Sequence, residues 1–98
     1  MAGVPEFSTG SKTAIGTSAV QITSRAINAR RGVQIMASAA NSVSVYIGPH
    51  GVTAGTSSAD TDGYPLAAGE AVVVPIIEPN KIYAITASST ASISFMLV

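Results

Sequence analysis

The sequence predicts an all-β fold: a small antiparallel β-sandwich of the jelly-roll type, or an open barrel, with an extended N-terminal arm. Short segments rich in β-branched residues recur along the chain, and most of them alternate between apolar and polar side chains. Turn residues separate these segments about every 8–12 positions, which is typical of sandwiches and small barrels. The nearest helical candidate, residues 24–32, is short and weakly periodic.

The first 12 residues are expected to form the arm, ahead of a single β domain at residues 13–98. Gly, Pro, Ser and Thr dominate this segment, and such a composition predicts a connection rather than a strand. Two large apolar residues, Val4 and Phe7, lie within it. Because chain ends are usually disordered unless something holds them, we expect a sister subunit or a different protein to hold the arm.

The body is expected to contain six to eight strands. They fall in residues 13–24, which hold one or two strands, and in 32–39, 42–48, 71–77, 81–87 and 91–98. Alternation assigns one apolar face to each of four segments, formed by Val33, Ile35 and Ala37, by Val43, Val45 and Ile47, by Ile82, Ala84 and Thr86, and by Ile93, Phe95 and Leu97.

Turn residues predict how these strands connect. Residues 40–41 and 88–90 are expected to close two hairpins, each between consecutive strands. Pro75 lacks an N–H group, so its strand is expected at a sheet edge or a bulge. Residues 48–65 form a long polar loop, which we expect to be functional or mobile, with a short strand near residues 52–53.

In the stretch GYPLAAGEAVVVPI, residues 63–76, the turn residues are expected to set the path of the chain and to have no role in catalysis. Pro65 is expected to set a turn and Leu66 to plug the end of the core. Gly69 supplies a position with positive φ before the next strand, and Glu70 keeps that corner solvated. The stretch is therefore predicted to carry the chain from one sheet to the other.

The composition favours a protein that works packed against other proteins. Only 10% of the residues are charged, against about 25% in an average soluble domain. The formal net charge is 0, which promotes association. The balanced charge argues against nucleic acid as a direct partner. No apolar run approaches the roughly 20 residues of a membrane helix. Residues 1–12 lack the basic and apolar regions of a secretory signal, so we expect none there.

No residue set predicts catalysis, a cofactor or a metal ion. The sequence lacks cysteine and the common nucleotide, hydrolase and metalloprotease motifs. His50, the single histidine, is interpreted as an exposed turn residue. Asp60 and Asp62 resemble only the start of a calcium loop, and nothing pairs them with Glu70 for acid–base work. We therefore expect a non-enzymatic protein.

Three of the five basic residues, Arg25, Arg30 and Arg31, lie close together in the sequence. Without interleaved aromatic residues they are a weak nucleic-acid signal. Since arginine is enriched at protein interfaces, the cluster is interpreted as an interface anchor.

Three patterns in residues 32–98 resemble small virion proteins of tailed bacteriophages. They are V-Y-hydrophobic-G-x-x-G-V, then G-x-P-L-x-x-G-E, then hydrophobic-Y-hydrophobic-I before a short last strand. The matching residues are Val45, Tyr46, Gly48, Gly51 and Val52, then Gly63, Pro65, Leu66, Gly69 and Glu70, then Ile82, Tyr83 and Ile85.

The resemblance implies a capsid decoration, or cement, protein on the exterior of the virion head, made in the host cytoplasm without a signal peptide. Such proteins often sit as homotrimers and bridge subunits of the major capsid protein. The expected partner-binding residues are Val4, Phe7, Lys12, Arg25, Arg30 and Arg31. Val4 and Phe7 would enter a groove on a capsid subunit or a sister protomer, and the arginines would pair with capsid acids.

Two other functions stay open. A tail, baseplate or fibre-anchoring component would share the fold and differ in copy number per particle. A glycan-binding module would need aromatic platforms, for which the chain offers Tyr46, Tyr64 and Tyr83 but no tryptophan.

Overall fold

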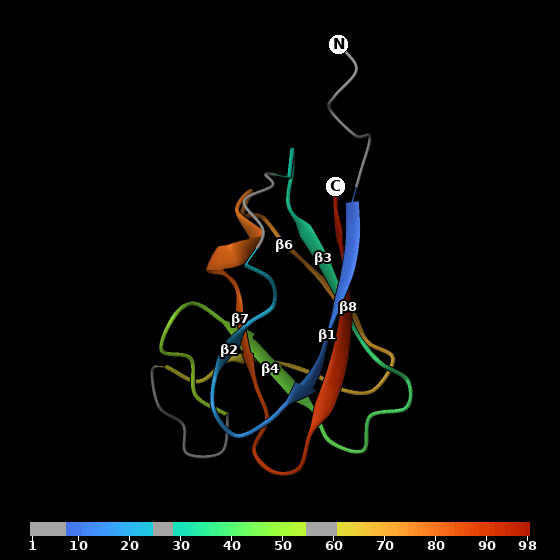
Figure 1. The fold of residues 1–98 in the computed structure, drawn as a ribbon, viewed down its shortest axis with the longest axis vertical. Helices are drawn as coiled ribbons and strands as arrows, with labels where there is room; N and C mark the ends of the chain where they lie inside the picture. The colour runs from blue at the N-terminus through green and yellow to red at the C-terminus, as the bar shows by residue number, and fades with distance from the viewer. Residues whose placement is uncertain (1–7, 25–28, 55–60) are drawn as a thin grey trace.

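The computed structural model describes residues 8–24, 29–54 and 61–98, and its eight strands form two four-stranded antiparallel sheets (Figure 1). Sheet A has the order β1-β8-β3-β6, and sheet B has the order β2-β7-β4-β5. The predicted β-sandwich is therefore confirmed, and the sheets do not close into a barrel. The strands are β1 (Ser8–Ile15), β2 (Val20–Gln21), β3 (Val33–Ala37), β4 (Val45–Gly48), β5 (Tyr64–Leu66), β6 (Ala71–Val74), β7 (Tyr83–Ile85) and β8 (Ala91–Leu97).

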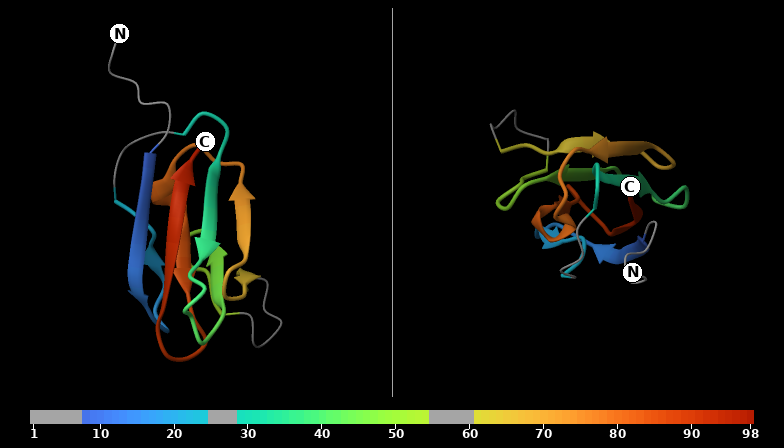
Figure 2. Two further views of the ribbon diagram at one scale, coloured as in Figure 1. Left: turned by 90° about the vertical axis from the view of Figure 1, so that its right-hand side faces the viewer. Right: turned by 90° about the horizontal axis from the view of Figure 1, so that it is seen from above.

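The strand pairing is that of a jelly roll. β1 pairs with β8, β2 with β7, β3 with β6 and β4 with β5, as in one long hairpin folded over on itself. The pairings β3–β8 and β4–β7 then hold the folded hairpin closed. The left panel of Figure 2 shows sheet A with β1 in blue, β8 in red, β3 in teal and β6 in orange side by side. The connection between β4 and β5 is the tip of this hairpin.

Apolar residues that alternate with polar ones fill the space between the sheets. Burial follows the predicted inward faces in β3, β4 and β8, whose alternate residues are buried. β7 departs from this rule, because Ile85 is buried although its neighbour Ala84 faces the core. The largest side chains in the core cluster are Ile15, Ile22, Ile35, Ile47, Leu66, Ile82, Ile93, Phe95 and Leu97.

The two predicted hairpins were wrong. β3 lies in sheet A and β4 in sheet B, while β7 lies in sheet B and β8 in sheet A. The connections at residues 40–41 and 88–90 therefore cross between sheets. Local turn residues look the same in both situations, because a chain that changes sheets also has to turn sharply.

Side-chain hydrogen bonds fix both crossings. The amide group of Asn41 takes the place of a strand residue: its Nδ2 donates to the Ser92 carbonyl and its Oδ1 accepts from the Ser92 N–H, each at 2.9 Å. At the other crossing Ser89 has a φ of 61°. The buried hydroxyl of Thr86 donates to the Ser89 carbonyl at 2.9 Å and so holds that turn.

The crossover from β5 to β6 forms largely as predicted. Leu66 is buried at the end of the core, and Gly69 has a φ of 82°. Glu70 is exposed, and its Oε1 accepts from the Ala67 N–H at 2.9 Å. The predicted turn at Pro65 was wrong, since Pro65 lies within β5 opposite Tyr46. A proline is tolerated there because β5 is an edge strand.

The described part of the expected arm is a strand. Residues 8–12 belong to β1 and pair with β8 from Ser8 opposite Leu97 to Lys12 opposite Ile93. Their Ser, Thr and Gly content does not prevent this, because β1 is an edge strand with one face in solvent. Val4 and Phe7 lie outside the described residues.

The connection at the hairpin tip packs on the outer face of sheet B. Val52 is buried although it is outside the main core cluster. A Cβ at Gly48 would lie 2.5 Å from a Val52 methyl carbon, and one at Gly63 would lie 2.8 Å from it. Gly51 has a φ of 89°, which turns the chain back towards the sheet. The pattern V-Y-hydrophobic-G-x-x-G-V is therefore a packing device. The expected short strand is an isolated bridge between Thr53 and Asp62.

Candidate functional site

The residues predicted to bind a partner do not form one cluster. Val4, Phe7 and Arg25 lie outside the described residues. Arg30 and Arg31 are exposed, and their backbone N–H groups donate to the Val98 oxygen at 2.9 and 2.7 Å. Lys12 pairs with Ile93, four positions along β8 from Leu97 and therefore about 13 Å from that end.

Among the described residues, one end of the sandwich nevertheless holds two of them, Arg30 and Arg31. Ser8 pairs with Leu97 at the same end of β8 where Arg30 and Arg31 contact Val98. Phe7 is bonded to Ser8, so its Cα lies within about 3.8 Å of this end. The start of β1 and the end of β8 lie together there in Figure 1.

Lys12 has a structural role at the sheet edge. Because it lies opposite the buried Ile93 in an antiparallel pair, its side chain is on the inner face of β1. A bulge follows between Lys12 and Ile15, where Ala14 has a φ of 56°. An inward charge and a bulge are two devices that stop an edge strand from pairing with another chain.

The other three edge strands are blocked as well. Pro65 lies inside β5, and Pro75 follows β6 directly. β2 is only two residues long. The prediction that Pro75 confines its strand to an edge is confirmed. Contacts of this protein are therefore expected to use sheet faces and side-chain grooves rather than added strands.

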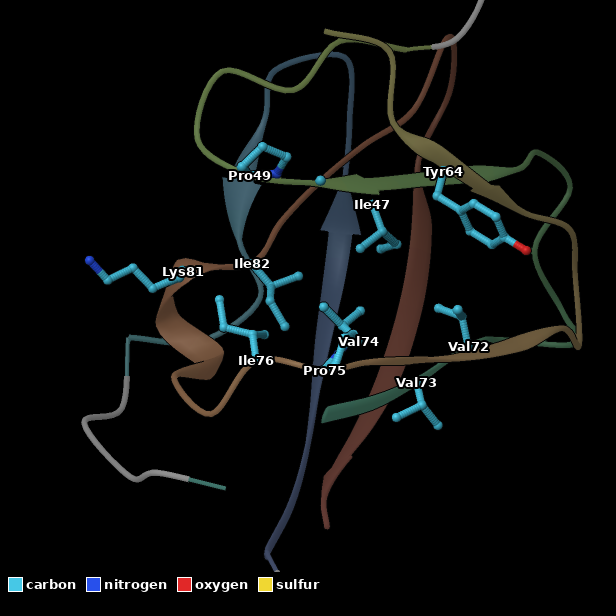
Figure 3. Close-up of a pocket in the computed structure, with 11 residues that line it drawn as sticks. Ile47, Pro49, Tyr64, Val72, Val73, Val74, Pro75, Ile76, Lys81 and Ile82 are labelled. Atoms are coloured by element: carbon cyan, nitrogen blue, oxygen red, sulfur yellow. The ribbon is translucent and has the colours of Figure 1, made fainter. Parts of the chain in front are cut away.

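An apolar groove lies between the edge strands of the two sheets, β5 and β6 (Figure 3). We call it the edge groove; its volume is about 330 Å³, and its apolar walls include Ile47, Tyr64, Val72, Val74, Ile76 and Ile82. In Figure 3 Ile47, Val74 and Ile82 point into the space between the strands, and Val73 points away from it. The groove exists because β5 and β6 are short and, in the part of the chain that the structure describes, no further strand covers this side of the core.

The edge groove continues into a polar hollow of about 550 Å³. The two share Pro49, Ile76 and Lys81. In the hollow the rings of His50 and Tyr83 meet edge to face, with centroids 5.2 Å apart. The hollow is thus aromatic and polar on one side, and the exposed Lys81 belongs to the lining of both parts, with its side chain extending outwards in Figure 3. Such a site can hold an apolar group that carries a neighbouring negative charge.

The described strand residues on the outer face of sheet A carry no charged side chain. Its central positions form two rows across the four strands, Ser11–Ser94–Met36–Ala71 and Thr9–Met96–Gln34–Val73. Met36 is 44% exposed and Val73 is 53% exposed, and both are large apolar residues. A shallow hollow of about 500 Å³ crosses β1, β8 and β3 on this face. An uncharged face with exposed apolar residues is typical of a protein-contact surface.

The carboxylates singled out in the sequence serve turns and bridges where the structure describes them. Asp62 Oδ1 accepts from the Thr53 hydroxyl at 2.9 Å, and Glu70 belongs to the β5–β6 crossover. Asp60 lies outside the described residues. His50 is exposed, as predicted. Within the described ranges, no three His, Cys, Asp or Glu side chains come close enough to hold a metal ion.

The three tyrosines do not share one surface. Tyr46 and Tyr83 lie on the outer face of sheet B, where they pair with Ile85 and Gly48. Tyr64 is 61% exposed and lines the edge groove. A glycan platform would therefore have at most two of them.

Sequence reasoning missed the edge groove and the sheet-A face. Both depend on which strands are neighbours, and local patterns do not contain that information. One signal was present: two prolines, Pro65 and Pro75, each mark an edge strand, and the residues around them are strongly apolar. Two edges of this kind from different sheets leave an uncovered apolar opening.

The comparisons with known proteins add no relatives. No protein-family model and no curated protein matches the sequence, and no solved structure matches the fold. Within the described ranges, no helix has the length and apolar character needed to cross a membrane.

Proposed function

We propose that this chain is a non-enzymatic virion structural protein of a tailed bacteriophage, most specifically a decoration protein on the capsid exterior. The observation that carries the proposal is the uncharged outer face of sheet A, on which Met36 and Val73 are exposed. A surface of this kind is unfavourable in water and becomes favourable when a partner covers it. The three sequence patterns in residues 32–98 resemble those of small virion proteins, so we propose that the partner is another protein of the virion.

The fold suits such a role. Jelly rolls are common in viral capsid and lectin domains, although a fold by itself does not determine a function. Blocked edges at β1, β2, β5 and β6 prevent uncontrolled strand addition at high local concentration. A protein that covers a lattice in many copies needs this protection, since its neighbours are identical chains.

The end of the sandwich near Ser8 is proposed to face the major capsid protein. Arg30 and Arg31 are exposed there, and Phe7 is covalently adjacent. The two guanidinium groups would pair with capsid carboxylates. A homotrimer would bind at a threefold position and multiply these contacts.

A tail or baseplate component is the second candidate. A sandwich with protected edges would serve equally well to attach other tail proteins. The described part of its surface has no feature that favours binding to a head lattice over binding to a tail ring. A glycan-binding module has one supporting observation, the shared outer face of Tyr46 and Tyr83 beside His50.

Copy number per particle separates these candidates. Virions whose genome encodes this chain would be purified, and the chain would be quantified against the major capsid protein by isotope-labelled peptide mass spectrometry. A head decoration protein requires hundreds of copies in a fixed ratio to the capsid protein. About three to a dozen copies would assign the chain to the tail, and its absence from particles would reject the virion proposal.

A further inference from the structure

We propose that the edge groove of one copy receives the N-terminal segment, residues 1–7, of a second copy of the same chain. Phe7 and Val4 would fill the apolar part, and Glu6 would pair with Lys81 at its mouth. This contact is independent of the virion role, because it needs only the chain itself.

The groove has the chemistry for this segment. Its walls are apolar side chains from both sheets, and its volume is about 330 Å³. Besides Met1, residues 1–7 contain two large apolar side chains, Val4 and Phe7. Burying them removes apolar surface from water on both sides of the contact, which is the main favourable contribution to association.

The charges are complementary as well. Glu6 is the only charged side chain in residues 1–11. Lys81 is exposed, lines both the edge groove and the polar hollow, and is the only charged side chain that lines the edge groove among the described residues. Of the acids that the structure describes, Asp62 and Glu70 accept hydrogen bonds from Thr53 and Ala67, and the exposed Glu78 precedes the 3-10 helix that ends at Lys81. In the proposed contact, the carboxylate of Glu6, which is next to Phe7, would therefore face the ammonium group of Lys81 at the edge groove.

The reach of the chain excludes its own groove for Phe7. Ser8, Leu97, Val33 and Val74 form one row across sheet A. Three strand spacings separate Ser8 from Val74, which is about 14 Å. The Cα of Phe7 lies within about 3.8 Å of the Ser8 Cα, so its ring cannot cross the sheet to the groove on the far edge. A second copy removes this restriction.

A segment-into-groove contact is heterologous, since it joins two different surfaces. Repeated from copy to copy, such contacts close into a ring when the rotation between copies divides a full turn, and otherwise extend into a filament. Blocked strand edges leave side-chain insertion as the available way for a chain segment to bind at β5 and β6. The inference therefore supplies a physical basis for self-association of the chain, and a closed homo-oligomer is its expected form where the rotation closes.

Cysteine trapping tests the contact directly, because the natural chain contains no cysteine. Full-length Phe7→Cys and Ile76→Cys proteins would be mixed under mild oxidation, and the mixed disulfide would be identified by mass. Tyr64→Cys, at a groove position that is 61% exposed, repeats the test if Ile76→Cys folds poorly. Ser94→Cys, exposed on the outer face of sheet A, is the matched control partner for Phe7→Cys.

We expect Phe7→Cys to couple to the groove cysteine at least about tenfold faster than to the control cysteine. Equal rates would overturn the proposal. Charge exchange gives a second readout by sedimentation velocity. Glu6→Lys and Lys81→Glu should each weaken self-association about threefold, and an equimolar mixture of the two should recover part of it. A wild-type chain that stays monomeric at high concentration, or charge variants that associate like wild type, would also overturn it. These measurements use no virions, so their failure leaves the head-binding proposal to its own test.

Discussion

At the residue scale, several positions that look featureless in the sequence determine the shape of the chain. Gly48 and Gly63 leave room for the Val52 side chain on the outer face of sheet B. Asn41 replaces a strand residue by bonding both backbone groups of Ser92. In each case the side chain, or its absence, controls where a connection lies. Such residues stabilise the frame on which the proposed contact surfaces sit.

Gly63→Ala is expected to destabilise the protein by about 1–3 kcal/mol, because the new methyl group would overlap the Val52 and Tyr46 side chains. Thermal unfolding followed by circular dichroism measures the loss. Gly16→Ala is the control, since a Cβ there meets no atom within 4 Å. Equal melting temperatures for the two variants would contradict the packing role of Gly63.

Asn41→Ala is expected to cost about 1–3 kcal/mol of unfolding free energy, because the N–H and carbonyl of Ser92 lose their partner together. Hydrogen exchange should show faster exchange of the Ser92 amide. Ser42→Ala, at the exposed neighbouring position, should change neither quantity. If the Ser92 amide keeps its protection in Asn41→Ala, the strand-like role of Asn41 is wrong.

At the element scale, the sequence predicts strands and faces well and predicts their neighbours poorly. The inward residues of β3, β4 and β8 follow from alternation, since a half-buried strand requires it. Both predicted hairpins failed because a jelly roll pairs its first strand with its last. Turn chemistry is local, whereas that pairing joins Ser8 to Leu97. The edge groove was missed for the same reason, since it lies between two strands of different sheets.

Lys12→Val is expected to raise self-association through β1, because it removes the inward charge from the edge strand. Sedimentation velocity and light scattering at increasing concentration would detect the larger species. Ser11→Val is the control: it adds the same side chain to the same strand on the opposite, outer face and keeps Lys12. The edge-protection account fails if both variants associate to the same extent.

At the scale of the whole molecule, the chain combines a protected frame with two unprotected surfaces. All four edge strands are blocked, while the outer face of sheet A and the edge groove expose apolar side chains. The expected binding residues Arg30 and Arg31 lie at the end where β1 begins. Composition alone predicted that the protein associates with other proteins, but the two surfaces could be located only once the strand order was known.

Removal of residues 1–7 is expected to weaken capsid binding at least about tenfold while the sandwich stays folded. The deletion must stop there, because residues 8–12 form most of β1 and a longer deletion would remove a strand from sheet A. Near-ultraviolet circular dichroism and the melting temperature verify the fold. The expected loss would come from the lost contact between copies, which lowers the number of capsid contacts per particle of protein. Unchanged binding by the folded, shortened chain would show that residues 1–7 do not contribute to capsid binding.

The most direct test of the central claim is co-sedimentation of the purified chain with mature phage heads from which it has been stripped. Bound copies would be counted by densitometry against the major capsid protein. A capsid decoration protein should saturate at hundreds of copies per head, in a ratio set by the capsid symmetry, and Arg30→Glu/Arg31→Glu should reduce the affinity without changing that number. A chain that stays in the supernatant at every concentration would contradict the decoration role.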